Sequence, residues 1–237
     1  MTTRIGVIGS GYISKGLVQA LLRCDDLAPS RVLTRSDVRG RDDYPQPGLL
    51  TNDLAAVLRE SDLIVECSGD VAHATEVVDA ALHEGLPVVT MDAEMQVTTG
   101  SYFVGSGLLT EAEGDQPGCL AALAEEARGM GFSPLVYGNI KGFLDRYATA
   151  EGLMHEAAVR NLNPIQCCAY TDGTKLDIEM AIIANACGLT TLTPGMYGPR
   201  AAHVQDIFNC FDFKTLWADR RPFVDYILGA EPGGGVF

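Results

Sequence analysis

Short apolar runs alternate with helical patterns of apolar residues through the first part of the chain. The run Leu63–Cys67 is almost wholly apolar, as expected of a parallel strand that is covered on both faces. The stretch His73–His83 has a helical pattern and is followed by Gly85, a residue that favours the end of a helix. This alternation predicts an α/β fold with a doubly wound parallel sheet. The runs expected to form strands are 5–8, 31–34, 49–50, 63–67, 87–91, 104–109 and 133–137.

The pattern loosens after the last of these strands. We therefore expect one domain over residues 1–137 and a smaller α+β module over residues 138–237. The clearest helix of the second module opens at Asp172–Lys175 and ends at Gly188, with apolar residues at helical spacing between them. The other elements expected here are a turn, a helix and a strand, at Asn139–Gly142, Thr149–Arg160 and Ile165–Tyr170.

A glycine turn follows the first strand and precedes a helix, the order that a dinucleotide-binding fingerprint requires. Gly9 permits the tight turn, and Gly11 lets the backbone approach a pyrophosphate at the positive end of the helix. The third fingerprint position is Ser14, so Gly16 is expected to supply the close contact between helix and strand. Alternatively, the turn is kept without a cofactor, as in some α/β domains. The residues expected to contact the cofactor here are Gly9, Ser10, Gly11, Tyr12 and Ile13.

Composition narrows the class of protein. The chain has 237 residues, of which 47% are hydrophobic and 20% are charged, as in a globular protein. The net charge of -14 disfavours nucleic acid and anionic membrane surfaces as partners. Met1 leads almost directly into the first strand, so no signal peptide is expected, and no apolar run reaches transmembrane length. The seven cysteines form no CxxC pair, so we expect reduced thiols and a cytoplasmic protein.

The segment after the second strand is locally basic. Thr34 lies about 20 residues beyond the glycine turn, where an NAD-binding fold usually places a carboxylate for the ribose 2′-hydroxyl. Here Thr34, Arg35 and Ser36 offer a guanidinium and two hydroxyls, which suit a 2′-phosphate better than a diol. We therefore expect NADP rather than NAD, the alternative being that the arginines face solvent. The strand-end residues expected in the same cofactor site are Cys67, Ser68, Gly69 and Met91.

Lys175 is the first candidate for proton transfer. It lies in the first turn of its helix, where the helix dipole disfavours a cation and so eases proton exchange with a substrate oxygen. Asp172 could orient Lys175 or serve only as the helix cap. In the alternative interpretation, Lys175 pairs on the surface with Glu179 one turn later. Lys141 is the second candidate, either as a catalytic acid, as a contact to an anionic substrate, or simply as a solvated loop lysine.

Several carboxylates stand at predicted strand ends or at a helix start. They could bind a substrate amine or hydroxyl groups, or they could bind a divalent cation, so the sequence leaves open whether a cation takes part. The alternative is that these carboxylates cap helices or lie on the surface. No Ser-His-Asp or Cys-His spacing stands out, which disfavours a hydrolase. The candidate carboxylates for substrate binding are Glu94, Asp115, Asp177 and Glu179.

Six stretches carry a family resemblance: GSGYISKGL, VECSGD, VVTMDAE, EGDQPG, GNIKGFLD and, most specifically, YTDGTKLDIEMAIIANACGL. Through them the chain resembles the homoserine-dehydrogenase-like oxidoreductases, including proteins similar to the deoxyxylulose-phosphate-reductoisomerase-like enzyme. The resemblance runs from about Ile5 to Phe237. It implies an NAD(P)-binding Rossmann domain and then a catalytic domain, whose sheet often mediates dimerisation in such enzymes. A homodimer, or another homo-oligomer, is therefore the expected assembly.

The resemblance also implies roles for particular residues. In true homoserine dehydrogenases, a lysine and an acid near the corresponding helix act on the substrate hydroxyl, and these roles fall on Lys175 and Asp172. Glu94 or Glu179 would then contact an amine or hydroxyl. The spacing from acid to lysine is shorter here, so the substrate is not carried over. Relatives of this subgroup usually continue into a domain resembling SAF domains, whereas this sequence stops after Glu231–Phe237, as a shortened member or a piece of a longer protein would.

Together these features predict hydride transfer between NADPH and a small polar carbonyl or alcohol, with Lys175 exchanging the proton. One alternative is a reductoisomerase of a sugar phosphate, in which a divalent cation assists a carbon-skeleton shift before reduction. Another is a nucleotide-sensing or scaffold protein that keeps the fold without turnover.

Overall fold

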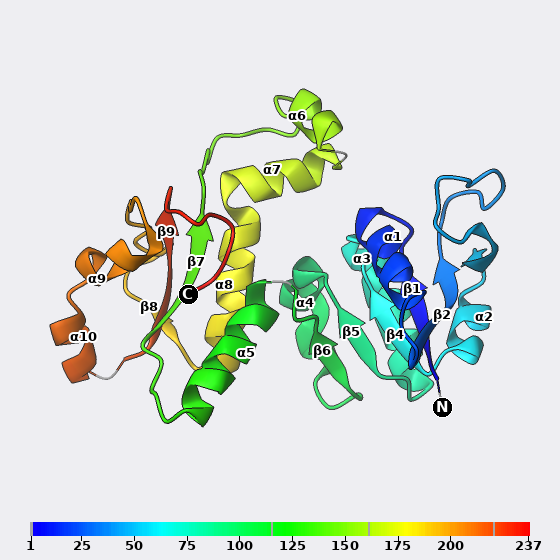
Figure 1. The fold of residues 1–237 in the computed structure, drawn as a ribbon, viewed down its shortest axis with the longest axis horizontal. Coiled ribbons are helices and arrows are strands. Elements are labelled where there is room, and N and C mark those ends of the chain that lie inside the picture. The colour runs from blue at the N-terminus through cyan, green and yellow to red at the C-terminus, as the bar shows by residue number, and fades with distance from the viewer. Residues whose placement is uncertain (1, 115, 161, 220) are drawn as a thin grey trace. The chain divides into compact units, whose positions relative to one another are not determined.

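The computed structural model describes residues 2–114, 116–160, 162–219 and 221–237. The chain divides into two compact units, Met1–Ala112 and Glu113–Phe237, each built around a parallel sheet (Figure 1). This division lies earlier than the boundary expected at residue 137. The difference arises because strand β7 (Val136–Lys141) pairs with a strand close to the chain end and not with the first sheet.

The first unit contains a six-stranded parallel sheet in the order β3-β2-β1-β4-β5-β6. This order, in which the chain reverses direction across the sheet beside β1, confirms the doubly wound prediction. The elements are β1 (Thr3–Ile8), α1 (Tyr12–Leu21), β2 (Leu27–Leu33), β3 (Leu50–Thr51), α2 (Leu54–Glu60), β4 (Leu63–Glu66), α3 (Val71–His83), β5 (Val88–Thr90), α4 (Ala93–Thr99) and β6 (Leu109–Glu111).

Apolar side chains cover both faces of this sheet. Val7 of β1 packs in one buried cluster with Val18 of α1, whereas its neighbour Ile8 packs in another cluster with Val57 of α2 and Val77 of α3. Successive strand residues point to opposite faces, so β1 contributes to both clusters. The carboxyl end of β1, and hence the glycine turn, is thereby held between two layers of helices.

Close packing beside β1 depends on Gly6 rather than on Gly16. A Cβ on Gly6 would collide with the side chains of Ser61 and Ile64, so only glycine fits there. Gly16 is exposed on α1, and a Cβ there would meet no atom within 4 Å. The expected role of Gly16 in the contact between helix and strand is therefore wrong, because the close approach occurs on the other face of β1.

Two strand boundaries in the first unit differ from the sequence prediction. Strand β2 begins at Leu27, four residues before the expected start, because its first residues pair with β1 although few of them are strongly apolar. The expected strand at 104–109 is reduced to the short β6, and Val104 is largely exposed. In both cases pairing with a neighbouring strand, and not local hydrophobicity, sets the boundary.

The second unit contains a three-stranded parallel sheet in the order β7-β9-β8. The segment at the end of the sequence adds an antiparallel bridge at the free edge of β7, where the ring of Phe237 occupies the space that a Cβ on Gly138 would need. The other elements are α5 (Gln116–Gly129), α6 (Met154–Val159), α7 (Pro164–Asp172), α8 (Thr174–Cys187), β8 (Thr190–Thr191), α9 (Ile207–Cys210), α10 (Phe213–Asp219) and β9 (Phe223–Leu228).

The sequence prediction fails at two places in this unit. The expected strand Ile165–Tyr170 is the helix α7, which Asn163 caps by accepting a hydrogen bond from the backbone of Ile165 and which has Pro164 in its first turn. The expected turn Asn139–Gly142 is mostly strand, since its first three residues complete β7. The pairing of β7 with β9, far along the chain, overrides the turn signal of the glycine.

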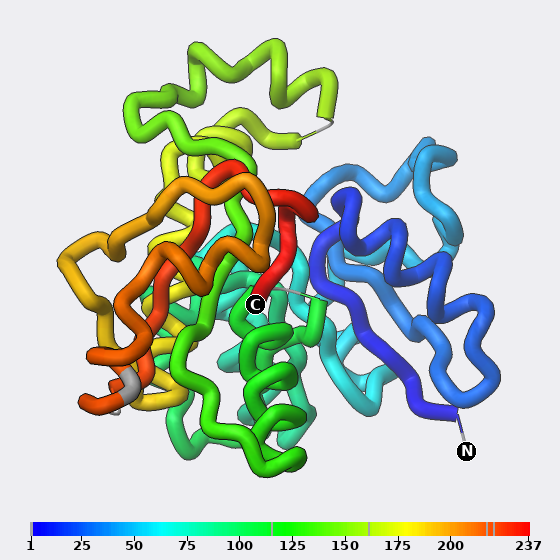
Figure 2. The backbone as a smooth tube through the Cα atoms, turned by 60° about the vertical axis from the view of Figure 1, so that its left-hand side comes forward, coloured from blue at the N-terminus to red at the C-terminus, as the bar shows by residue number. Residues whose placement is uncertain are grey.

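The predicted helix after Gly173 is confirmed as α8. Gly173 and Gly188 both have left-handed backbone angles, with φ of 93° and 65°, and they bound the helix. The chain leaves β7, passes through α6 and α7 and then enters α8, as the yellow-green part of the trace in Figure 2 shows. A hydrogen bond from Asp145 N to Thr171 O (3.0 Å) ties this excursion back to the end of β7.

None of the helices in the described residues is long and apolar enough to cross a membrane. All seven cysteines have free thiols.

Candidate functional site

The glycine turn has the geometry of an anion site. Gly9 has a φ of +100°, and a Cβ there would lie 2.9 Å from Ser68 Cα, so glycine is required. Gly11 is the N-cap of α1 and, as a glycine, makes no side-chain cap hydrogen bond to the first turn of this helix. A Cβ on Gly11 would meet no protein atom within 4 Å. The positive end of α1 is therefore open to a phosphate, while Tyr12 beside it is largely exposed.

Ser14 and Ser10 hold the turn in place. Ser14 is fully buried, and its hydroxyl lies 2.6 Å from the hydroxyl of Tyr44. Burial raises the pKa of that tyrosine. The Ser10 hydroxyl lies 2.8 Å from that of Thr34 at the end of β2. The third fingerprint position thus serves packing, and Ser10 joins the turn to the neighbouring strand.

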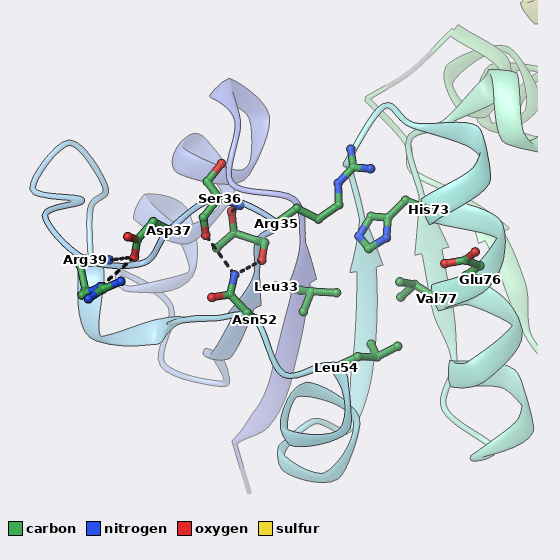
Figure 3. Close-up of a pocket in the computed structure, with 11 residues that line it drawn as sticks. Leu33, Arg35, Ser36, Asp37, Arg39, Asn52, Leu54, His73, Glu76 and Val77 are labelled. Atoms are coloured by element: carbon green, nitrogen blue, oxygen red, sulfur yellow. Dashed lines mark hydrogen bonds and ion pairs between the residues drawn. The ribbon is translucent and has the colours of Figure 1, made fainter.

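A cavity of about 520 Å³ lies at the carboxyl ends of β2 and β3 (Figure 3). Its outer edge is shaped by the side-chain amide of Asn52, which donates hydrogen bonds to the carbonyl oxygens of Thr34 and Ser36. The residues that line it are Leu33, Thr34, Arg35, Ser36, Asp37, Arg39, Asn52, Leu54, His73, Glu76 and Val77.

The two arginines of the cavity form ion pairs with neighbouring carboxylates. Arg35 donates a hydrogen bond to Asp70 (2.7 Å) from the atom Nη2, and its Nε and Nη1 make no hydrogen bond within the described residues. Arg39 pairs with Asp37 at 3.2 Å. In Figure 3 the side chain of Arg35 extends from the end of β2 toward His73 on α3. The predicted Thr34–Ser36 segment therefore does present a guanidinium to a cavity.

The loop after β4 packs against the glycine turn. Cys67 donates from its thiol to Ile8 O (3.2 Å), and burial, reinforced by Glu66, raises the pKa of this thiol to about 12. Cys67 is therefore a structural thiol. Ser68 and Gly69 follow it at the carboxyl end of the strand, and Asp70 caps α3 by accepting a hydrogen bond from His73 N (3.1 Å).

Sequence reasoning missed Glu66. It is fully buried, and its carboxylate accepts hydrogen bonds from Ser68 and Thr90. The available signal was a single acid inside the apolar run LIVEC. A buried carboxylate requires partners, so its presence in a central strand indicated a polar network.

The residues after β5 extend this arrangement. Met91 N donates to Glu66 O (3.0 Å), and Asp92 caps α4 by accepting from Met95 N (2.9 Å). Glu94 follows in the first turn of α4. Met91 and Glu94 thus lie at the carboxyl edge of the sheet, the edge that also carries the glycine turn.

In the second unit, Lys141 is a buried lysine at the end of β7 and not a solvated loop residue. Its ammonium donates to Tyr170 O (2.6 Å) and lies 3.7 Å from the centre of the Tyr170 ring. Burial lowers the pKa of Lys141, and the nearby Lys175 lowers it further, while Glu179 and Asp172 act in the opposite direction. The structure thereby brings four predicted site residues into one electrostatic cluster.

Lys175 and Glu179 form an ion pair on α8, with Nζ and Oε1 3.6 Å apart. The side chain of Glu179 is only 5% exposed and that of Lys175 is 30% exposed. The pair is therefore not the surface pair considered in the sequence analysis. Lys175 reaches from the buried carboxylate toward the protein surface.

Asp172 is the last residue of α7, and Gly173 after it is the N-cap of α8. Its carboxylate accepts a hydrogen bond from Thr174 N (2.8 Å), and the thiol of Cys168 lies 3.8 Å from its other oxygen. This hydrogen bond satisfies a backbone N–H in the first turn of α8, the turn that carries Lys175. Asp177, another candidate, pairs with Arg146 at 3.5 Å. Asp115 lies outside the described residues.

Within the described ranges, no group of three His, Cys, Asp or Glu side chains is arranged to hold a metal ion.

Two family models match the chain. Residues 114–237 match the model described as "Oxidoreductase DRL, catalytic domain". Residues 9–102 match the model described as "Homoserine dehydrogenase, NAD binding domain". The first match contains the cluster of Lys141, Asp172, Lys175 and Glu179, here called the lysine cluster. The second contains the glycine turn and the cavity of Figure 3.

Solved structures similar to the chain include a homoserine dehydrogenase from Thiobacillus denitrificans, with 21% identity, a TM-score of 0.47 and coverage of 54% of this chain and 34% of that one. An NAD-binding protein from Listeria innocua has 16% identity, a TM-score of 0.42 and coverage of 61% and 46%. Biliverdin reductase from Synechocystis, in complex with biliverdin and NADP+, has 15% identity, a TM-score of 0.42 and coverage of 60% and 47%. The chain thus spans less than half the length of each of these relatives. No curated protein matches it.

Proposed function

The chain belongs to the DRL oxidoreductase family, and from this premise we propose that it transfers a hydride between NADPH and a small polar carbonyl or alcohol. The observation that carries the proposal is the amino end of α1. There the N-cap residue Gly11 makes no side-chain cap, and its missing Cβ leaves room for a pyrophosphate. The nicotinamide ring supplies the hydride chemistry, and the protein supplies position and charge.

Several features of the first unit fit a dinucleotide. The backbone of the turn from Gly9 to Ile13 would hold the pyrophosphate, and the cavity of Figure 3 would receive the adenosine part. The cavity has an apolar floor made by Leu33, Leu54 and Val77, which suits a flat base. Its rim carries the hydroxyls and guanidinium groups that a phosphorylated ribose needs.

The end of β2 supports NADPH rather than NADH as the cofactor. The buried Thr34 follows β2 where an NAD-binding chain usually places an acid for the ribose 2′-hydroxyl. The two free nitrogen donors of Arg35 and the hydroxyl of Ser36 would bind a 2′-phosphate. A guanidinium binds phosphate through paired, charge-assisted hydrogen bonds, whereas it gains less from a neutral hydroxyl.

An Arg35→Gln variant is expected to bind NADPH about 10-fold or more weakly, because a hydrogen bond between charged groups contributes about 1.5–3 kcal/mol. NADH affinity should change by less than about two-fold, since NADH lacks the 2′-phosphate. Fluorescence titration with both nucleotides measures the effect. Arg59→Gln, at an exposed arginine outside the cavity, removes the same charge and should leave both affinities unchanged. Equal losses for the two nucleotides in Arg35→Gln would contradict the assignment of the 2′-phosphate site.

The second unit supports the proton transfer that accompanies hydride transfer. Lys175 is partly exposed and would exchange a proton with the substrate oxygen, while its ion pair with Glu179 orients the ammonium. Lys141 adds a second positive charge in a buried setting, where it would favour the developing negative charge on that oxygen. Asp172 holds the first turn of α8 in place.

Turnover itself can be tested with NADPH and a panel of carbonyl compounds. The panel would contain aldehydes derived from amino alcohols, keto sugars, sugar phosphates and simple hydroxyketones, and the loss of NADPH absorbance would be followed. We expect oxidation of NADPH with a small polar member of the panel, at a rate that does not depend on an added divalent cation. A chain that binds NADPH tightly yet oxidises it with none of these compounds would favour the nucleotide-sensing alternative. Activity that depends on an added divalent cation would favour the reductoisomerase.

A further inference from the structure

Glu66 is a buried carboxylate that the proposed hydride transfer does not use. It is the last residue of β4, in the middle of the first sheet between β1 and β5, and it is fully buried. Placing a carboxylate in a protein interior costs free energy unless hydrogen bonds compensate for the lost water. A residue of this kind in a central strand therefore has a specific structural task.

The hydrogen bonds of Glu66 connect two loops at the carboxyl edge of the sheet. One carboxylate oxygen accepts hydrogen bonds from the backbone N–H of Ser68 (2.7 Å) and from its hydroxyl (2.6 Å). The other oxygen accepts from the hydroxyl of Thr90 (3.0 Å), which is itself fully buried and accepts from Asp92 N (3.0 Å). Both oxygens are thus satisfied, and the loops after β4 and β5 are tied to one side chain.

The loop that Glu66 holds is the wall behind the glycine turn. Ser68 Cα lies so near Gly9 that a Cβ on the glycine would be 2.9 Å away. The hydroxyl of Ser68 also accepts a weak hydrogen bond from Asp70 N (3.4 Å), and Asp70 anchors Arg35. A shift of this loop would therefore disturb both the pyrophosphate turn and the guanidinium beside the cavity.

We propose that Glu66 is a positioning residue for the dinucleotide, which sets the shape of the turn by fixing Ser68 against Gly9. This inference rests on the proposed function, since it assumes that the turn binds a nicotinamide dinucleotide. Glu66 itself is buried beneath the loop, so it acts through Ser68 and not by contact with the cofactor. Because the pyrophosphate is common to both nucleotides, a change of Glu66 should alter the affinities for NADPH and NADH equally.

The test compares three variants by fluorescence titration with NADPH and with NADH, at a temperature well below the melting point of each variant. Glu66→Met, which keeps the size of the side chain but accepts no hydrogen bonds, should weaken the binding of both nucleotides by about 10-fold. Glu66→Gln can still accept from Ser68 and can donate to Thr90, so it should stay within about two-fold of wild type. Thr90→Val removes one of the partners of Glu66 and should give an intermediate loss of about three-fold for both nucleotides.

Rescue by glutamine separates a positioning role from mere stability, because the melting temperature can fall in all three variants while affinity falls only where the hold of Glu66 on Ser68 is lost or loosened. If Glu66→Met does not fold, Thr90→Val becomes the test of the proposal. Unchanged affinity of Thr90→Val for both nucleotides would then overturn it. A folded Glu66→Met with wild-type affinities would overturn it as well. A wild-type chain that binds neither nucleotide would instead refute the proposed function, and this role of Glu66 with it.

Discussion

A Lys175→Met variant is expected to lose about 10²–10⁴-fold in turnover, the usual contribution of a positioned proton donor. Methionine has a similar length but carries no proton to exchange with the substrate oxygen. The affinity for NADPH should change by less than about two-fold, because the glycine turn and the cavity belong to the other unit. Steady-state rates and fluorescence titration together measure the two effects.

Lys214→Met is the matched control for this prediction, because Lys214 is exposed on α10 and lies outside the lysine cluster. It should change neither turnover nor affinity. Unchanged turnover in Lys175→Met would move the role of proton donor to Lys141. The melting temperature of each variant should be recorded, since Lys175 is the ion-pair partner of the buried Glu179.

The pH dependence of turnover gives a second measure of the same cluster. Burial lowers the pKa of Lys141 from its ordinary value of 10.5. As the pH rises through this lowered pKa, the cluster loses a positive charge. The rate of carbonyl reduction should therefore begin to fall before the pH reaches 10.5. In Lys141→Met this fall in rate should be absent, and the rate should be lower than that of wild type at pH values below the lowered pKa. A pH profile identical to that of wild type would show that Lys141 does not take part.

A Gly11→Ala variant is expected to lose at least about 10-fold in affinity for both NADPH and NADH while it folds normally. Gly11 has a φ of −81°, which alanine adopts without strain, and its new Cβ would meet no protein atom. The methyl group would instead occupy the open space where the pyrophosphate approaches the helix. Calorimetry of the free protein and titration with both nucleotides measure the two quantities separately.

Two further glycine variants serve as controls for this result. Gly16→Ala lies one turn along the same helix in open space, so it should leave affinity unchanged and stabilise the helix by up to about 1 kcal/mol. Gly9→Ala should destabilise the fold as well as abolish binding, because of its positive φ and its contact with Ser68. If Gly11→Ala binds both nucleotides like wild type, the open space at α1 is not the pyrophosphate site.

The nucleotide experiments separate three functions of the first unit. Arg35→Gln should affect NADPH alone, since it removes a contact to the 2′-phosphate. Gly11→Ala should affect both nucleotides without loss of stability, because it fills the ligand's space. Glu66→Met should affect both nucleotides and be rescued by glutamine, because it acts through the wall of the turn. A single set of titrations therefore distinguishes a residue that contacts the nucleotide, a residue that leaves space for it and a residue that positions the turn.

The local patterns of the sequence were sufficient for the elements that carry their own signals. The apolar run Leu63–Cys67 predicted β4 because strands covered on both faces need continuous hydrophobicity. The α8 helix was predicted from its apolar spacing and from Gly188, and both boundaries are confirmed. The glycine turn between a strand and a helix was likewise readable, since Gly9 and Gly11 act through the backbone conformation of a few consecutive residues.

Other features depended on contacts between segments far apart in the chain. Lys141 was expected in a turn, but β7 pairs with β9 and places this lysine beside Tyr170. The segment of α7 is predicted as a strand because its apolar residues show no clear helical period, although Asn163–Pro164 is a start signal for a helix. Whether an apolar segment of this length forms a helix or a strand is decided by what packs against it.

The sequence by itself determined the succession of strands in the first unit, the glycine turn and the basic segment after β2, because each is encoded in neighbouring residues. Only the tertiary structure decided that Gly6 and not Gly16 provides close packing, that Glu66 ties Ser68 to Thr90, and that Lys141 and Glu179 are buried. Burial and hydrogen bonding of these side chains depend on strands and helices that come into contact only on folding. No local sequence pattern predicts those contacts.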